Sequence, residues 1–339
     1  MSSQTPHRSA GWAALGLFVL APLIGEYLHG NMSVTALPWL VLTAPLYGGG
    51  ALLIREVARR AQRGWSTIFL LALAYGVIEE GLVTHTLFNP SYFGYPLLSW
   101  APVPTLGMGA WWTIFVLTLH AVWSISASIA LAEALVPRRA AQPWLSNRGL
   151  ALAGAVFVLG AVTNWLATYE IERFVAAPGQ LAGTTAAAGI LVAAAFLVTG
   201  RRAEPVGSPA PSPWQVAAIA FAVTSAFIVL GWFPGWPTVV VYLALYAVSA
   251  RLLARWSKRP GWNERHVLAL TGGALVTYAW YAFPSQPLVG AGGLVDVVGN
   301  VLFALGLAGL LWRAARATRS RPSARSGAGR PTHIEQTDA

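Results

Sequence analysis

Residues 66–88 read STIFLLALAYGVIEEGLVTHTLF, an apolar run that carries two adjacent glutamates in its second half. Its length is close to the ~20 residues that a helix needs to cross a ~30 Å hydrocarbon core. Nine further stretches have the same apolar character: 11–29, 34–54, 109–135, 149–168, 182–199, 214–233, 237–254, 265–283 and 293–312. The pattern predicts an all-α transmembrane bundle of about ten helices.

The basic residues predict how this bundle is oriented. If the N-terminus is cytoplasmic, the segments on the inner side hold 21 of the 22 Lys and Arg residues, and only Arg173 falls outside. Most of these cations lie in short loops beside helix ends, where the positive-inside rule applies. The sequence therefore predicts that both termini are cytoplasmic. It predicts a multi-pass protein of the inner or plasma membrane whose basic loops meet anionic lipid headgroups.

Composition excludes several classes of protein. The chain is 56% hydrophobic and 10% charged, whereas soluble domains carry roughly 25% charged residues. An isoelectric point near 10.5 would suggest nucleic acid as the partner of a soluble protein. Here the cations lie beside the membrane, so lipids are the expected partners and nucleic acid is not. The chain has no cysteine, which excludes disulfides, thiolate nucleophiles and cysteine metal sites.

We expect one integral membrane domain over residues 8–316. A Pro- and Ser-rich cytoplasmic linker, 201–213, follows the sixth helix, and the Arg-, Ser- and Gly-rich segment 317–339 is predicted to be a disordered basic cytoplasmic tail. The outer loop 89–108 carries aromatic residues and no charge. It is typical of an interfacial anchor, with a lid or re-entrant loop as the alternative.

Ionisable side chains inside a membrane are costly, so each is a candidate functional residue. At ~1.5 Å of rise per residue, Glu79 and Glu80 lie roughly 20 Å from the cytoplasmic boundary and His120 lies roughly 16 Å below the outer one. Glu133 lies nearer the cytoplasmic end and is expected to pair with an arginine such as Arg55. The polar residues predicted to share the outer half of the bundle are Glu26, Glu79, Glu80, His85, His120, Asn164, Asp296 and Asn300. Together they predict a polar cavity there.

The Glu79–Glu80 pair carries the strongest chemical signal. Two adjacent carboxylates in a low-dielectric site cannot both ionise cheaply, so one is expected to keep its proton unless a cation compensates. Such a pair, with His120 on the next helix, suits acid/base chemistry on a water molecule. The helical period places Thr84 on the face of Glu80 and Ser124 on the face of His120, and it pairs Asp296 with Asn300. The alternative is a buried polar network that only fixes helix packing.

Two motifs resemble those of known membrane proteases. Ile78-Glu79-Glu80-Gly81 resembles the first motif of the CPBP family of intramembrane endopeptidases and of the related PrsW-like proteases. His120-Ala121-Val122-Trp123-Ser124 resembles their His-x-x-x-Asn/Asp motif, with Ser124 at the last position. The resemblance implies that a glutamate activates the hydrolytic water, that His120 stabilises the oxyanion, and that Asp296 or Asn300 supplies a further polar group. Thr84 stands where the CPBP motif has arginine.

Three functions remain open at this point. The resemblance favours an intramembrane endopeptidase that acts on a membrane-embedded protein or peptide. Buried carboxylates and the Gly-rich segments 48–50 and 290–293 also fit a proton-coupled secondary transporter. A non-catalytic sensor or assembly protein is the third class. The chain has no His-Glu-x-x-His motif, so no metal or other cofactor is predicted, although the glutamates and histidines could bind a divalent ion.

Overall fold

The computed structural model describes residues 5–197 and 207–319, so residues 201–206 of the predicted linker and 320–339 of the predicted tail lie outside it. The first half contains α1 (Thr5–Pro22), η1 (Leu23–Tyr27), η2 (Val34–Trp39), α2 (Leu40–Arg60), α3 (Trp65–Ile78), η3 (Glu79–Val83), η4 (Leu97–Ser99), β1 (Pro102–Val103), β2 (Met108–Gly109), α4 (Ala110–Thr118), η5 (Leu119–Ala127), α5 (Ser128–Leu135) and η6 (Pro137–Arg139). The second half contains α6 (Asn147–Glu172), α7 (Pro178–Leu197), α8 (Pro213–Leu230), α9 (Trp236–Trp256), α10 (Glu264–Tyr281) and α11 (Leu294–Arg319).

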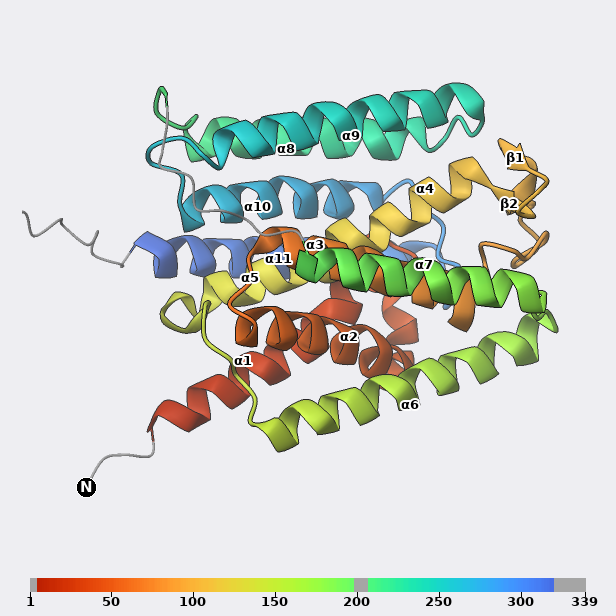
Figure 1. Ribbon diagram of the computed structural model, residues 1–339, viewed down its shortest axis with the longest axis horizontal. Coiled ribbons are helices and arrows are strands. Elements are labelled where there is room, and N and C mark those ends of the chain that lie inside the picture. Colours follow the sequence, from red (N-terminus) through yellow and green to blue (C-terminus); the bar gives the residue numbers. More distant parts are fainter. Residues whose placement is uncertain (1–4, 198–206, 320–339) are drawn as a thin grey trace, which may run out of the picture.

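The described residues confirm the predicted bundle of about ten membrane helices. Within residues 5–197 and 207–319, nine helices are long and apolar enough to span a bilayer. The tenth helix, α10, lies between α8 and α11 and contacts both of them (Figure 1). Its polar residues His266, Thr271 and Thr277 are buried. Because neighbouring helices shield α10 from lipid, it can cross the bilayer with a less apolar sequence.

The arrangement of the helices agrees with the charge pattern. The start of α1 and the end of α11 lie at the same end of the bundle, as do the turns that join α2 to α3 and α9 to α10 (Figure 1). The hairpin of β1 and β2 lies at the opposite end, together with the turn between α6 and α7 that contains Arg173. α11 continues through Arg319, three residues into the segment predicted to be a disordered tail. The last turn of the helix carries Arg316 and Arg319.

The most buried helices lie in the middle of the molecule. In the most apolar part of the spans Trp65–Val83 and Ala110–Leu135, 67% of the residues are buried, against 11% in Asn147–Glu172. The helices α6, α8 and α9 form the edges of the bundle (Figure 1). Their exposed apolar side chains are what a lipid-facing surface requires. Glu79, Glu80 and His120 therefore lie on the inner helices, away from lipid.

The span formed by α4, η5 and α5 joins two hydrophobic clusters. Ala121, Ile125 and Ile129 pack with α1, α2 and α3. Trp123 packs with α8 and α10, where its indole nitrogen donates to the carbonyl of Ala274 at 2.7 Å and its ring stacks on Tyr278. Helices before and after the linker therefore share one core.

At the end of the bundle that carries the basic loops, the predicted pairing of Glu133 is confirmed. Glu133 accepts from Arg55 at 3.2 Å and from Arg59 at 2.6 Å. Arg55 is fully buried, lies over the ring of Trp144 at 3.4 Å and also pairs with Glu56 at 2.5 Å. These contacts attach the loop after α5 to α2, which is a structural role.

Candidate active site

Glu79, Glu80 and His120 meet in the interior of the bundle. The imidazole Nε2 of His120 lies 2.7 Å from Oε2 of Glu79 and 2.6 Å from Oε1 of Glu80. All three side chains are buried. One ring nitrogen therefore faces two carboxylates at hydrogen-bond distance, in surroundings that strengthen each charge–charge interaction relative to water.

The local backbone explains how adjacent glutamates reach one histidine. Glu79 and Glu80 open the π-helical segment η3, and His120 lies in the π-helical segment η5. In a regular α-helix neighbouring side chains diverge by about 100°, and the wider π turn reduces that angle. The segment η1, which contains Glu26, is also a π-helix. Single π turns inside α-helices are frequent at functional sites, and here three of them surround one polar cluster.

Glu80 is held by hydroxyl groups that follow it in the chain. The hydroxyl of Thr84 donates to Oε2 of Glu80 at 3.3 Å, as the shared helical face predicted. Thr86 donates to the same oxygen and in turn accepts from the indole nitrogen of Trp112 at 3.1 Å. These contacts fix the orientation of Glu80. Oε2 of Glu79 is buried and has no hydrogen bond of suitable geometry among the described residues.

Helix α2 and segment η1 extend the cluster. Tyr47 donates to Glu26, whose other carboxylate oxygen accepts from Asn31 at 2.6 Å. The rings of Tyr47 and Tyr75 lie 5.8 and 5.9 Å from the ring of His120. Neither tyrosine was a predicted site residue. Within the described chain, the Tyr75 hydroxyl and Nδ1 of His120 are buried without a hydrogen-bond partner, so both are available to a substrate or to water.

The outer loop lies close to the same carboxylates. Tyr92 belongs to this loop, and burial raises the pKa of its hydroxyl well above the usual range, with a further contribution from Glu80 and Glu79. Tyr92 is therefore neutral and able to donate a hydrogen bond. The loop is also tied to the end of α6, because Glu172 accepts from Asn89 at 2.9 Å and from the backbone of Phe93 at 3.1 Å. These contacts favour the alternative that the loop covers the site.

The predicted residues of helix α11 have their own contacts. Asn300 donates to the carbonyl of Ala282 at 3.0 Å and lies 3.4 Å from Asp296. Both side chains are buried, and their hydrogen bonds in the described chain link α11 to the end of α10 rather than to His120. The shared face of Asp296 and Asn300 is therefore observed. Their convergence with the glutamates stays a prediction.

Three other predicted residues have different neighbours. Asn164 donates to the carbonyl of Leu42 at 2.9 Å and so joins α6 to α2. His85 is buried against Phe174, with ring centroids 6.4 Å apart. Ser124 is buried beside Gly25, where an added Cβ would lie 3.1 Å from its hydroxyl oxygen. Of these, only Ser124 lies against a π segment of the cluster, whereas Asn164 is a packing residue.

A family model covers most of the chain, including the cluster. Residues 15–317 match the model of an uncharacterized membrane protein family. The chain belongs to this family. It is therefore a multi-pass membrane protein. No curated protein and no solved structure matches the chain.

The three central residues of this family member also form a candidate ligand set for a divalent cation. Glu79, Glu80 and His120 each offer one ligand atom, and these atoms lie within 4.8 Å of one another. Imidazole and carboxylate groups suit zinc and related ions. An ion bound there would polarise a water molecule. Without a metal, the same three side chains can accept and donate protons.

Proposed function

We propose that this protein is a hydrolase of the intramembrane endopeptidase type, located in the inner or plasma membrane. The observation that carries the proposal is the contact of His120 with both Glu79 and Glu80 inside the bundle. General acid/base catalysis needs groups that can accept and return a proton within hydrogen-bond reach. The resemblance of the Glu-Glu and His-x-x-x-Ser motifs to those of membrane proteases points in the same direction.

The contacts of the two glutamates suggest separate roles. Glu80 accepts from Thr84 and Thr86, which hold it in place, so we assign it to orienting His120. Oε2 of Glu79 has no such hydroxyl partner in the described chain. Glu79 is therefore the better general base. It would take a proton from water as the water oxygen attacks the carbonyl carbon of a peptide bond.

The remaining steps use groups next to the carboxylates. The developing oxyanion needs a donor, and the Tyr75 hydroxyl and the ring of His120 are nearby donors in a water-poor site. The proton accepted by Glu79 then passes to the leaving amine nitrogen as the carbon–nitrogen bond breaks. The products are a carboxylic acid and an amine. A membrane-embedded protein or peptide is the substrate class that fits a site on the inner helices.

The proposal is tested with a purified membrane-peptide substrate in proteoliposomes. Glu79→Gln, Glu80→Gln and His120→Ala are each expected to lower the cleavage rate at least about 100-fold, the usual minimum for loss of an acid/base group. Asn164→Ala, which removes a half-buried polar side chain that joins α6 to α2, is the matched control. Cleavage that is unchanged in all three site variants would refute the enzyme assignment. Loss of activity in EDTA that returns with added metal would reassign the three residues as metal ligands.

A proton-coupled transporter is the second candidate. The observation that favours it is the continuation of the cluster through Tyr47 to Glu26, which places titratable groups from three separate helical segments next to one another. Such a chain of groups is what a proton path requires. This reading predicts solute flux driven by a pH gradient and lost in Glu26→Gln. If the protein cleaves the peptide and no solute class shows flux that depends on the pH gradient, the transporter is excluded and the hydrolase is supported.

A further inference from the structure

Helix α9 presents an apolar surface to lipid. It lies at the edge of the bundle (Figure 1), and in the most apolar part of its span only 17% of the residues are buried. Its exposed apolar side chains on the side of the helix that carries Arg251 include Val240, Val241 and Val248. A lipid acyl chain is the natural neighbour of this surface.

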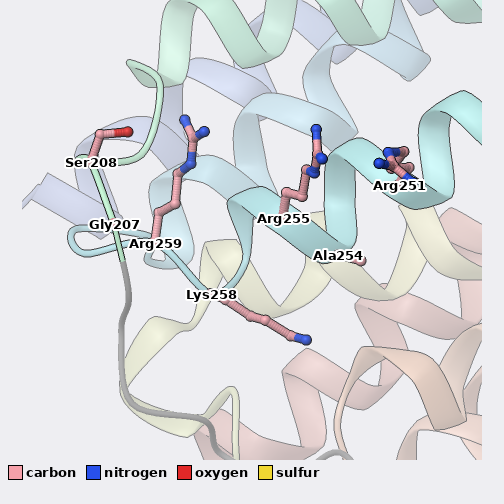
Figure 2. Close-up of a pocket in the computed structure, with 7 residues that line it drawn as sticks. All are labelled: Gly207, Ser208, Arg251, Ala254, Arg255, Lys258 and Arg259. Atoms are coloured by element: carbon pink, nitrogen blue, oxygen red, sulfur yellow. The ribbon is translucent and has the colours of Figure 1, made fainter.

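A basic cleft lies where this apolar surface ends. It has a volume of about 650 Å³ and is lined by Gly207, Ser208, Arg251, Ala254, Arg255, Lys258 and Arg259. These seven residues include four cations and no carboxylate. Figure 2 shows Arg255 and Arg259 extending to the same side of the helix end, beside the segment that holds Ser208. Arg251 and Arg255 are four residues apart and so share the helix face that leads up to the cleft.

The wall opposite the helix is fixed by hydrogen bonds. The backbone nitrogen of Ala210 donates to the carbonyl of Pro260 at 2.9 Å. Nε2 of His266 lies 3.0 Å from the carbonyl oxygen of Pro211, and Ser212 caps α8. These contacts hold the segment that begins at Gly207 against the turn between α9 and α10. The cleft is therefore an open groove between this segment and the end of α9.

The cations of the cleft have no anionic partners in the described chain. None of Arg251, Arg255, Lys258 and Arg259 forms an ion pair or a side-chain hydrogen bond there. The arginines at the cytoplasmic end of α2 differ, because Arg55 and Arg59 both pair with Glu133. Four neighbouring like charges repel one another, and a bound anion relieves this repulsion. The cleft is thus suited to a ligand with negative charge.

We propose that the cleft binds the headgroup phosphate of an anionic phospholipid whose acyl chains lie along α9. The guanidinium groups of Arg251 and Arg255 match the geometry of a phosphate, and Lys258 and Arg259 add positive charge. The apolar surface that leads into the cleft favours a lipid over a soluble anion. The cytoplasmic side predicted for these residues is also where anionic headgroups attract basic segments. This binding site is independent of the proposed hydrolase activity.

The test compares lipids bound to the purified full chain by native mass spectrometry. Phosphatidylglycerol is expected to bind several-fold more tightly than phosphatidylcholine with the same acyl chains. The double variant Arg251→Gln/Arg255→Gln should bind phosphatidylglycerol about 25-fold more weakly, because each cation near a membrane surface contributes about fivefold. The matched control is Arg148→Gln/Arg313→Gln, which removes two exposed cations outside the cleft. The control should retain wild-type binding.

Three results would overturn the proposal. Equal binding of phosphatidylglycerol to wild type and to the cleft variant would show that the cleft does not select the lipid. An equal loss in the control variant would indicate a general effect of surface charge. Full displacement of the lipid by millimolar inorganic phosphate would show that the cleft takes a free anion instead. Because Arg251 and Arg255 are exposed, thermal melting should be unchanged. The variant Arg251→Lys/Arg255→Lys keeps both charges and loses the guanidinium geometry, so its binding should lie between that of the wild type and that of the Gln variant.

Discussion

Individual buried charges in this protein fall into two kinds that differ in their partners. Arg55, Arg59 and Glu133 satisfy one another with opposite charges and backbone carbonyls. In the cluster of Glu79, Glu80 and His120, two carboxylates share one ring nitrogen. With Glu56 as a second partner of Arg55, the first arrangement sets two carboxylates against two guanidinium groups, which suits a structural role. In the second arrangement the two carboxylates and the imidazole can share protons, and acid/base chemistry uses such groups.

This distinction predicts a large effect of Glu133→Gln on stability. The change leaves Arg55 and Arg59 without their shared carboxylate in a buried site, which typically costs about 3–5 kcal/mol. The measurement is thermal or denaturant unfolding in detergent. Glu170→Gln is the matched control, because its pair with Arg173 is 64% exposed on the glutamate side and should contribute at most about 1 kcal/mol. Similar melting of both variants would argue against a structural role of the buried pair.

The sequence identified the residues of the cluster whose type is rare in a membrane. Glu79, Glu80 and His120 were predicted because ionisable groups in apolar segments are conspicuous. Tyr47 and Tyr75 were not predicted as site residues, since aromatic residues in membrane helices are usually packing or interface residues. Asn164 was included for its depth alone. Depth does not specify which way a side chain faces around the bundle, and Asn164 faces a backbone carbonyl of α2.

At the scale of the helices, the spans were predictable and their local geometry was not. Apolar length and charge fixed the number of helices and their approximate ends. The π segments η1, η3 and η5 leave no pattern in an apolar run, because every face of these buried segments is apolar apart from the few site residues. Their presence follows from tertiary packing. It changes the side-chain directions on which predictions from the α-helical period depend.

Close helix contacts lead to a prediction at the same scale. A Cβ at Gly48 of α2 would lie 2.1 Å from the backbone oxygen of Phe18 in α1, and backbone cannot yield as a flexible side chain does. Gly48→Ala is therefore expected to separate these helices and to lower stability by about 1–3 kcal/mol. Gly306→Ala in α11 is the control, since nothing lies within 4 Å of its Cβ position. Equal unfolding temperatures of the two variants would show that α1 and α2 tolerate a wider separation.

For the whole molecule, the helix directions gather the basic loops at one end of the bundle, which the predicted orientation requires. The cations define one end of the bundle from the sequence. The structure brings the loops that carry them to that end, and it places the hairpin of β1 and β2 at the other (Figure 1). The candidate site lies next to the loop on the hairpin side, through Thr86 and Trp112. The orientation therefore decides from which side a substrate or a solute would reach the glutamates.

Reporter fusions test this orientation. A reporter inserted at Tyr95, in the outer loop, is expected to be active on the external side, and one inserted at Ser208, at the basic cleft, on the cytoplasmic side. The reason is the strong preference of Arg-rich loops for the cytoplasm. If both reporters were active on one side, an even number of crossings would separate them, so one of the three spans Ala110–Leu135, Asn147–Glu172 and Pro178–Leu197 would not cross the membrane. If both sides were exchanged, the basic cleft would face outward, and the cytoplasmic lipid headgroup proposed for it would lose its support.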